Sequence, residues 1–298
     1  MLIACVLTVQ PEAPVTLSVD LGRATHAWFL SQIRRVDSAL AERLHEPNTT
    51  RPFTVSALRE VGPAIGGQVA LTPERQYWLR VTSFDAMLSR CWLEKVIPSL
   101  PRQITLAEAT FALKAVTCDS REHPWAGQTT YEALTQEHLL ETRAPARRWT
   151  LQFASPTTFR STAGESSLAD GDGRAYRVAG HNVPLPLPGL VFDSYLQRWN
   201  SFAPVALHPD LKRYAEECVA ISRYRLETAL VEFGPAREIG FTGHCQFIAL
   251  VHDPYWLRLL NLLAAFAFYA GTGHHTTRGL GQTRLLSPVS EGHSRADQ

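Results

Sequence analysis

The spacing of apolar residues in the first half of the chain changes several times, and each change predicts a new element of secondary structure. Runs that are β-branched, or that alternate between apolar and polar residues, indicate strands, whereas apolar residues three and four positions apart indicate a helix. Strands are therefore predicted at residues 2–9, 53–58, 77–84 and 103–118, and helices at residues 24–46 and 85–97. Asp85 is placed to cap the second of these helices, and Pro98 is placed to end it.

The second half repeats this order of elements without repeating the sequence. Strands are predicted at residues 149–154, 220–233, 239–251 and 282–286, and helices at residues 187–202 and 254–270. A polar insertion rich in Gly, Ser and Asp, residues 161–180, separates the first strand from the first helix. In both halves the order is therefore strand, helix, strand, strand, helix, strand, which is typical of a ferredoxin-like fold.

A polar segment between the two halves, residues 140–148, contains Pro145 and predicts a domain boundary. The expected fold class is α+β, with two ferredoxin-like (RRM-like) βαββαβ domains in tandem at residues 1–142 and 143–298. This fold hosts many unrelated functions, so the architecture alone does not identify an activity.

The overall composition is that of a globular protein, because 45% of the residues are hydrophobic and 19% are charged. The formal net charge is only +1, so the chain lacks the strongly basic character that usually marks a nucleic-acid-binding domain. Any RNA site must therefore be a local patch. The basic residues are nearly all arginine, which is better suited than lysine to forked phosphate contacts and to stacking on bases. Codon usage or a hot habitat would give the same bias.

The chain has five widely spaced cysteines: Cys5, Cys91, Cys118, Cys218 and Cys245. Their odd number and the lack of a C-x-x-C motif predict neither a zinc site nor a disulfide framework, and they fit a reducing cytoplasm. The N-terminus does not have the form of a secretory signal. The most apolar stretch, residues 255–270, includes Arg258 and Asn261, so we expect a buried helix rather than a membrane span.

Residues 271–282, G-T-G-H-H-T-T-R-G-L-G-Q, form a glycine-rich segment between the last predicted helix and the last predicted strand. The glycines allow backbone N–H groups to approach a phosphate closely, because no Cβ intervenes. Residues 269–286 contain no acid, and their basic residues are His274, His275, Arg278 and Arg284. This segment is the local basic patch that the net charge conceals. A glycine C-cap followed by an irregular connection is the competing interpretation.

The glycine-rich segment does not match two other kinds of site. It is not a nucleotide-triphosphate loop, because the G-K-[ST] ending is missing and the order is helix to strand. Adjacent histidines without further Cys, Asp or Glu nearby are weak evidence for a metal site. We therefore expect no metal and no other cofactor.

Several segments of the second half resemble the family of CRISPR repeat-processing endoribonucleases, which mature guide RNA. The most specific is A-F-A-F-Y-A-G-T-G-H-H-T-T-R-G-L-G-Q at residues 265–282, which is similar to the C-terminal glycine-rich signature of that family. P-L-P-L-P-G-L-V-F-D-S-Y-L-Q-R-W-N-S-F at residues 184–202, F-x-S-P-T-x-F at residues 153–159 and E-I-G-F-T-G-H-C at residues 238–245 also resemble family segments.

The resemblance continues in the first half and so spans nearly the whole chain. L-H-E at residues 44–46 and R-P-F-T-V-S at residues 51–56 are similar to the region that holds the catalytic histidine of the family. The resemblance is weakest at residues 90–148.

This resemblance implies a metal-independent endoribonuclease that cleaves CRISPR repeat RNA. The ribose 2′-hydroxyl would attack the neighbouring phosphate and leave a 5′-hydroxyl and a 2′,3′-cyclic phosphate. The protein must supply a base for that hydroxyl, an acid for the departing 5′-oxygen and positive charge for the phosphorane. Histidine suits both proton transfers, because its unperturbed pKa is about 6.5. Nothing in the sequence resembles a two-metal carboxylate cluster.

His45 is the first candidate catalytic residue, because it lies in the region that resembles the family's catalytic segment. Pro47 is expected to end the helix, which places His45 in its last turn. The negative end of an exposed helix favours a protonated imidazole by about 0.3–1 kcal/mol, which suits a general acid. A histidine that only caps the helix is the competing interpretation.

His26 is the second candidate, nineteen residues before His45. An unbroken helix would separate the two histidines by roughly 28 Å, which is too far for one site. Asp37 is a credible N-cap for a second helix, however, and a fold-back there would bring both histidines near one phosphate. Which histidine is acid and which is base stays open, as does the alternative that His26 only lines the edge of the core.

Two arginines complete the predicted catalytic group. The resemblance implies that Arg51 is a basic residue that neutralises the transition state. Members of the family often carry a tyrosine on the first helix, and the register places Arg35 or a neighbour there instead. This departure from the family's pattern favours a variant of the site that is centred on histidine.

Further RNA contacts are expected from the glycine-rich segment and from three arginines outside it. The predicted RNA-binding residues are Gly271, Gly273, His274, His275, Thr276, Thr277, Arg278, Gly279, Gly281, Arg160, Arg223 and Arg225. The competing interpretation for Arg223 and Arg225 is that an exposed strand arginine simply faces solvent.

The implied partner is the precursor transcript that carries CRISPR repeat RNA, and we expect a cytoplasmic protein that binds no membrane. The sequence leaves open whether the product enters a CRISPR effector complex and whether the protein forms a homodimer. Two other functions compete, namely a repeat-RNA-binding subunit that does not cut and a metabolic enzyme whose glycine-rich segment binds a small phosphate. The presence of His45, His26 and Arg51 favours cleavage, because a binding subunit would not need them.

Overall fold

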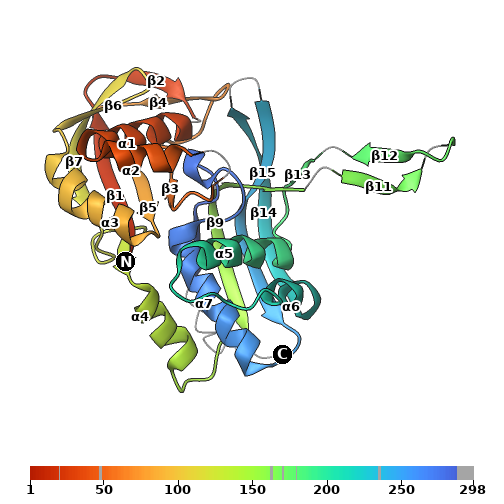
Figure 1. Ribbon diagram of the computed structural model, residues 1–298. Helices are drawn as coiled ribbons and strands as arrows, with labels where there is room; N and C mark the ends of the chain where they lie inside the picture. Colours follow the sequence, from red (N-terminus) through yellow and green to blue (C-terminus); the bar gives the residue numbers. More distant parts are fainter. Residues whose placement is uncertain are drawn as a thin grey trace, which may run out of the picture.

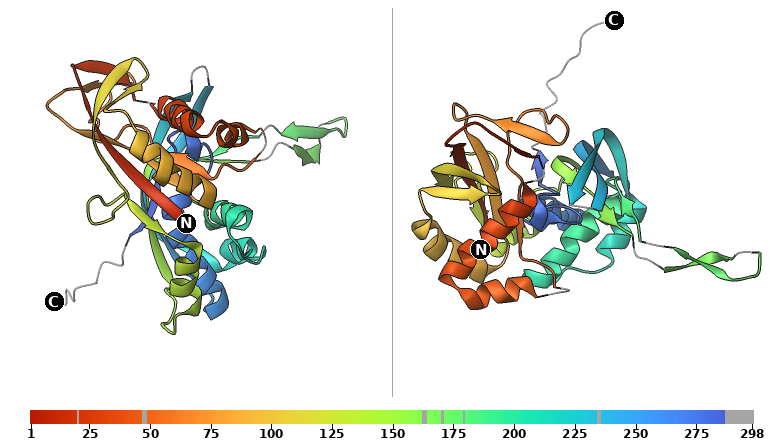
Figure 2. Two further views of the ribbon diagram at one scale, coloured as in Figure 1. Left: turned by 60° about the vertical axis from the view of Figure 1, so that its left-hand side comes forward. Right: turned by 90° about the horizontal axis from the view of Figure 1, so that it is seen from above.

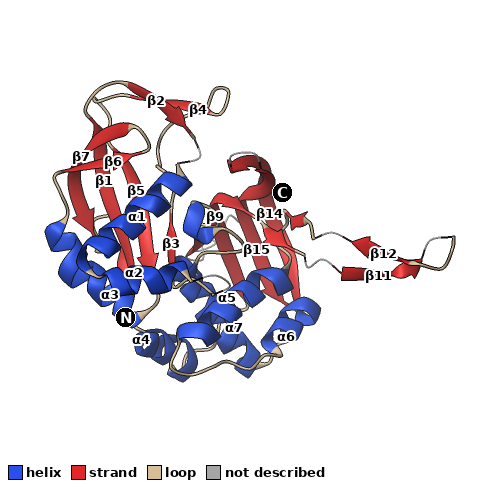
Figure 3. Ribbon diagram, turned by 45° about the horizontal axis from the view of Figure 1, so that its top comes forward, coloured by secondary structure: helices blue, strands red, loops and turns tan. Residues whose placement is uncertain are grey.

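The computed structural model describes residues 1–286, except residues 20, 47, 48, 162, 163, 170, 179, 234 and 235. Each half of the chain forms an antiparallel sheet with helices packed on one face (Figure 1, Figure 3). Pro47 lies outside the described residues, as do several residues of the polar insertion.

The first half is built on a sheet in the order β3-β5-β1-β7-β6, with β8 also paired to β1. Its strands are β1 (Leu2–Pro11), β3 (Phe53–Val55), β5 (Tyr77–Ser83), β6 (Gln103–Leu106), β7 (Ala109–Thr117) and β8 (Gly127–Thr129). Its helices are α1 (Gly22–Val36), α2 (Ser38–His45) and α3 (Ala86–Cys91), which continues as a π turn (Trp92–Val96) and a 3-10 turn (Ile97–Ser99). A separate two-stranded sheet pairs β2 (Val15–Ser18) with β4 (Gln68–Leu71).

The second half is built on a sheet in the order β14-β15-β9-β16. Its strands are β9 (Arg148–Thr157), β14 (Val219–Phe233), β15 (Ala236–Ala249) and β16 (Thr283–Leu286). Its helices are α5 (Pro188–Phe202), α6 (Leu211–Cys218) and α7 (Pro254–Ala270), and α4 (Tyr131–Thr135) with its π turn (Gln136–Leu140) comes before β9. Two short pairs follow β9: β10 (Phe159–Arg160) with β13 (Asn182–Val183), and β11 (Gly164–Ala169) with β12 (Ala175–Val178). The β11–β12 pair projects from the body as an arm (Figure 2).

The two sheets confirm the expected tandem ferredoxin-like fold. The main strands are β1, β3, β5 and β7 in the first half and β9, β14, β15 and β16 in the second. In each sheet the spatial order is the second, third, first and fourth of these strands, and all neighbours are antiparallel. This is the arrangement of the βαββαβ unit, in which the third strand lies between the first two.

Local sequence explains where the predicted elements divide. The helix expected at residues 24–46 is broken at Asp37, whose side chain accepts a hydrogen bond from Leu40 N (2.9 Å) and so begins α2. The strand expected at residues 103–118 is two strands, because the chain turns at Ala107, which has a φ of 53°. The helix expected at residues 254–270 is α7, with the same bounds.

The apolar positions of the two halves form two large cores. Alternate residues of β1 face the helices of the first half, where Phe29 and Trp92 are fully buried. In the second half, α7 packs on Leu151 and Phe247 of the sheet and is apolar around most of its surface. Within the described part of the chain, none of the helices has both the length and the apolar character needed to cross a membrane.

A buried arginine joins the two halves. Arg80 of β5 is 1% exposed, and its guanidinium donates to Trp125 O (2.8 Å), Gln282 Oε1 (2.8 Å) and Phe268 O (2.6 Å). Phe268 belongs to α7 and Gln282 to the end of the glycine-rich segment, so one side chain of the first sheet binds both. Burial lowers the pKa of Arg80 to about 9, which leaves the group charged at neutral pH.

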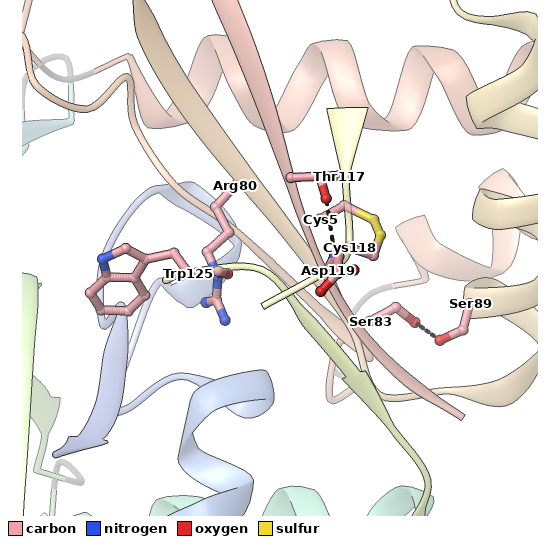
Figure 4. Close-up of a disulfide and its surroundings, with 8 residues drawn as sticks. All are labelled: Cys5, Arg80, Ser83, Ser89, Thr117, Cys118, Asp119 and Trp125. Atoms are coloured by element: carbon pink, nitrogen blue, oxygen red, sulfur yellow. Dashed lines mark hydrogen bonds between the residues drawn. A yellow bond between two sulfur atoms is a disulfide. The ribbon is translucent and has the colours of Figure 1, made fainter. Parts of the chain in front are cut away.

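Cys5 and Cys118 form a disulfide between β1 and the end of β7 (Figure 4). The expectation that the cysteines form no disulfide was therefore wrong. These residues are 113 positions apart, and antiparallel pairing brings their Cα atoms to 4.5 Å. Sequence spacing could not show this, because the partnership depends on which strands become neighbours.

Candidate active site

The glycine-rich loop, residues 271–282, packs against the start of α1 and against β3 (Figure 1). Gly22, in the first turn of α1, is so close to this loop that an added Cβ would lie 2.0 Å from Arg278 O. Ser56, which follows β3, pairs with Gly279 in a parallel bridge. The loop of the second half therefore lies directly on the elements of the first half that carry the candidate histidines.

His26 lies on α1 where the glycine-rich loop contacts this helix. Its Nδ1 is 2.7 Å from Thr277 O. Because a carbonyl oxygen only accepts hydrogen bonds, Nδ1 carries the proton and Nε2 of the neutral ring keeps a lone pair. The ring also stacks on Phe53 of β3, with 5.8 Å between centroids. The position and the tautomer of His26 are thus fixed by both halves of the chain.

The electrostatic surroundings of His26 favour its neutral form. Burial is the largest cause that lowers the pKa of His26 below its ordinary value of 6.5, and the hydrogen bond to Thr277 O partly opposes it. The nearby positive groups of Arg278, His45 and Arg51 lower this pKa further. His26 is therefore mostly neutral at pH 7, with Nε2 able to accept a proton.

His45 is the last residue of α2, and its side chain is exposed. The break at Asp37 turns α2 back so that it packs on α1. The charge of His45 lowers the pKa of His26, so His45 lies within electrostatic range of that ring. The break at Asp37 therefore gives His45 a position from which its charge reaches His26.

Arg51 lies just before β3, and its charge reaches His26. Its Nη1 is buried, and among the described residues no group accepts a hydrogen bond from it. Burial lowers the pKa of Arg51, Glu46 partly opposes this effect, and Arg278 adds to it. An unsatisfied buried donor is costly, so an anion bound here would supply the missing partner.

Arg35 is not brought to this cluster. Its Nη1 donates to Gln32 Oε1 (2.7 Å) on the preceding turn of α1, and its side chain is exposed. Nine residues separate Arg35 from His26 on this helix. At 100° per residue they point to opposite sides of α1 and lie roughly 13 Å apart along its axis.

The four glycines of the loop are required by its backbone path. Gly271, Gly273, Gly279 and Gly281 all have positive φ, between 65° and 101°. A Cβ on Gly281 would lie 2.1 Å from Thr272 O, and one on Gly273 would lie 2.3 Å from Thr158 O. Gly271 also forms the C-cap of α7, as the competing interpretation expected.

Much of the loop is inside the protein, so only part of the predicted RNA-binding segment can face a ligand. Gly271, Thr276, Gly279 and Gly281 are buried and act by shaping the loop. The N–H groups of residues 272, 274 and 281 donate to Gly281 O, Thr158 O and Pro156 O, so these amides are used within the fold. The exposed side chains are those of His274 and Arg278.

The paired histidines contribute little positive charge at neutral pH, contrary to expectation. Removal from water, and the proximity of rings whose centroids are 3.9 Å apart, lower the pKa of His274 to about 4. Burial also lowers the pKa of His275, although Glu238 Oε1 lies 3.1 Å from its Nε2. The positive charge of the loop surface therefore comes from Arg278 and from Arg160, whose charge reaches both rings.

Two side chains of α5 that sequence reasoning missed hold the loop in place. Arg198 donates to Gly273 O (2.6 Å) and Gly271 O (3.3 Å). The Tyr195 hydroxyl is 2.6 Å from Thr272 Oγ1. Burial lowers the pKa of Arg198 to about 10. Sequence could have pointed to them, because Tyr195 and Arg198 are polar residues three positions apart on the helix face that is expected to be buried.

Arg223 and Arg225 lie on β14, the edge strand of the second sheet, and both are exposed. They face Gln246 and His244 across the strand pair. Their strand forms the edge of the sheet opposite β16, the strand that directly follows the glycine-rich loop.

Among the described residues, no group of three or more His, Cys, Asp and Glu side chains is arranged to hold a metal ion. What the site does contain is two imidazoles, of which one has a fixed tautomer, beside two arginines. Such a group can transfer protons and bind a phosphate.

Family models match both halves of the chain. The CRISPR Cas6 N-terminal domain matches residues 1–136, and CRISPR-associated endoribonuclease Cas6 matches residues 151–283. Tandem ferredoxin-like units with a glycine-rich loop at their junction define the class of protein. The chain belongs to the Cas6 family of CRISPR-associated endoribonucleases.

Individual relatives agree with this assignment. CRISPR-associated endoribonuclease Cas6 from two strains of Mycobacterium tuberculosis is 27% identical over 168 residues, which cover 54% of this chain and 48% of the relative. The chain thus spans about half the length of the curated relatives it matches. Among solved structures, the Cas6 (TTHB231) product complex is 26% identical with a TM-score of 0.75, covering 96% of this chain and 100% of that one. A second structure, Thermus thermophilus Cas6 (TTHB231), is 25% identical with a TM-score of 0.67, covering 96% of this chain and 98% of that one.

Proposed function

We propose that this protein is a metal-independent endoribonuclease that cleaves CRISPR repeat RNA and so matures guide RNA. The observation that carries the proposal is the hydrogen bond between His26 Nδ1 and Thr277 O, which joins a neutral imidazole to the glycine-rich loop beside His45, Arg51 and Arg278. Membership of the Cas6 family supports the choice of substrate.

His26 acts as the general base. Its Nδ1–H is occupied by Thr277 O, so Nε2 is the nitrogen that can take the proton of the ribose 2′-hydroxyl. The lowered pKa keeps this nitrogen unprotonated at neutral pH. The 2′-oxygen then attacks the adjacent phosphorus and forms the 2′,3′-cyclic phosphate.

His45 acts as the general acid, because its exposed ring at the end of α2 is accessible to RNA. It donates a proton to the departing 5′-oxygen, which leaves as a hydroxyl. Arg51, whose buried Nη1 has no acceptor among the described residues, binds a non-bridging phosphate oxygen together with Arg278. These contacts stabilise the additional negative charge of the phosphorane.

Cleavage of labelled repeat RNA in excess EDTA tests the proposal. We expect one cut, with a 5′-hydroxyl and a 2′,3′-cyclic phosphate, that is abolished by a 2′-deoxy substitution at the cut site. His26→Ala and His45→Ala should each slow single-turnover cleavage by roughly 100- to 10,000-fold. His252→Ala is the matched control, because His252 is an exposed histidine outside the cluster.

The outcomes separate the competing functions. Tight binding of intact RNA would identify a binding subunit that does not cut. Failure to bind repeat RNA at moderate salt would favour a small-molecule enzyme of the same fold. Cleavage that requires a divalent metal ion would overturn the acid–base assignment.

The proposal extends to the organisation of the protein. Residues 1–142 would form the domain that carries the catalytic histidines, and residues 143–298 the domain that carries the loop. We propose a cytoplasmic protein because its RNA substrate is made there; the Cys5–Cys118 disulfide removes the support that the cysteine pattern gave to a reducing compartment. Entry of the product into an effector complex and pairing of two copies are further extensions, which gel filtration with and without RNA would test.

A further inference from the structure

A cavity of about 250 Å³ adjoins the histidine site. It lies between the end of α2, the segment that leads to β3, the start of α3 and the end of α5. Leu44 and Glu46, the residues on either side of His45, both line it. Arg51 lines it as well, so the cavity and the proposed catalytic group share a side chain.

Part of the cavity wall is apolar, and the two halves of the chain complete it together. Leu40 and Leu44 of α2 form one wall, and Met87 of α3 and Phe202 of α5 line the cavity as well. Phe202 is held against the first half by an edge contact with Phe84, at 5.3 Å between ring centroids. The aromatic ring of Phe202 and the aliphatic side chains around it suit a planar ring system.

The polar groups of the cavity have both signs of charge. Asp85 lines it while its Oδ1 caps α3 by accepting from Leu88 N (2.8 Å). Arg43 lines it with its Nη2 2.8 Å from the sulfur of Met87. Arg51 contributes the buried Nη1 for which the described residues supply no acceptor. A ligand that fits must therefore offer donors to a carboxylate and acceptors to arginine.

We propose that this cavity binds a guanine base of the nucleotide next to the scissile phosphate, an inference that rests on the proposed function. Guanine presents N1–H and N2–H₂ as adjacent donors, which suit the Asp85 carboxylate. On another edge it presents O6 and N7 as adjacent acceptors, which suit an arginine such as Arg43. A phosphate held by Arg51 lies one ribose away from its base, so the base falls within reach of the cavity.

This subsite makes the base beside the cut a determinant of specificity. RNA-binding proteins commonly read bases that are splayed out of single-stranded segments, through stacking and through hydrogen bonds to the base edge. The cavity supplies both kinds of contact. Because Phe202 belongs to the second half, the subsite exists only when the two halves are packed as they are here.

The test compares RNA substrates that differ only in the base on either side of the mapped cut. The bases are guanine, inosine (which lacks the 2-amino group), adenine and an abasic site. With the wild-type protein we expect kcat/KM at one of the two positions to be roughly tenfold higher for guanine than for inosine or adenine. Equal values for all bases at both positions would overturn the proposal.

Two substitutions assign the preference to the cavity. Asp85→Asn keeps a good helix cap but removes the carboxylate, so the guanine-to-inosine ratio should fall to about one. Met87→Trp fills the cavity from a position that is 57% exposed, so the ratio of guanine to abasic substrate should also fall to about one. Val205→Trp, at a site that is 69% exposed and outside the cavity, is the control and should keep the wild-type ratios. Wild-type ratios in both cavity variants would contradict the assignment.

A binding measurement separates this inference from the proposed function. The same series of RNAs with a 2′-deoxy substitution at the cut cannot be cleaved, and their Kd values report the base preference alone. If the protein cleaves RNA but shows no base preference in Kd or kcat/KM, only the cavity proposal fails. If it cleaves no RNA, the proposed function fails; a Kd scan in which each guanine of the repeat is replaced in turn by inosine then still supports or overturns the cavity.

Discussion

Gly22→Ala tests whether the contact between the glycine-rich loop and α1 positions the catalytic base. A Cβ at this position would lie 2.0 Å from Arg278 O and 2.8 Å from the Cα of Gly279. Ordinary contact requires about 3.4 Å, so the loop must retreat by more than about 1 Å. That retreat stretches the 2.7 Å hydrogen bond between His26 and Thr277 O, because Thr277 is adjacent to Arg278.

The expected effect on catalysis is larger than the effect on stability. Overpacking at one site costs typically about 1–3 kcal/mol of folding free energy. A misplacement of about 1 Å in a catalytic group can lower the rate roughly 100-fold. We therefore expect the single-turnover rate constant of cleavage to fall about 100-fold, while the Gly22→Ala protein stays folded at 25 °C.

The assay combines single-turnover cleavage, RNA binding and thermal unfolding of the same variant. Gly171→Ala is the matched control, because an added Cβ there meets nothing within 4 Å. The control should cleave at the wild-type rate. Cleavage by Gly22→Ala at the wild-type rate would refute the idea that the loop positions His26. A loss of rate no larger than the fraction of the variant that is unfolded would refute it as well.

Three other predictions follow from buried or charged side chains. Arg80→Met removes the donor for three acceptors, so we expect a loss of about 3 kcal/mol or more in the free energy of unfolding, measured by denaturant titration. A stability equal to wild type would show that Arg80 does not join the halves. Arg198→Met should weaken RNA binding and slow cleavage together, because the loop loses its bonds to Gly271 O and Gly273 O; an unchanged Kd would contradict this. Arg51→Ala should raise the pKa of His26, measured by NMR titration, because the positive charge of Arg51 lowers that pKa in the wild type. In the wild type, the cleavage rate should fall as the pH drops through the lowered pKa of His26, since the base becomes protonated.

The fold could be predicted to the extent that it depends on periodicity and caps. The 3.6-residue pattern located α7, and the short polar side chains of Asp37 and Asp85 located the starts of α2 and α3. The helix α6 was missed although Leu211, Tyr214 and Ala215 share one face, because it has only eight residues. Strand order followed from the repeated sequence of elements rather than from any residue.

The site could be predicted only in part, because its contacts join residues far apart in the chain. The histidines and Arg51 were identified by residue type and by resemblance. The roles of Gly22, Arg80 and Arg198 depend on what each touches across the junction, and periodicity does not report such partners. The disulfide and the neutral state of His274 were missed for the same reason, since both depend on neighbours in space.

The most direct test of the account uses an RNA in which the departing 5′-oxygen at the cut is replaced by sulfur. A thiolate leaves without a proton, so this substrate no longer needs a general acid but still needs a general base. We predict that His45→Ala cleaves this RNA at close to the wild-type rate, whereas His26→Ala remains impaired by roughly 100-fold or more. Rescue of His26→Ala instead, or of neither variant, would contradict the assignment of His26 as base and His45 as acid.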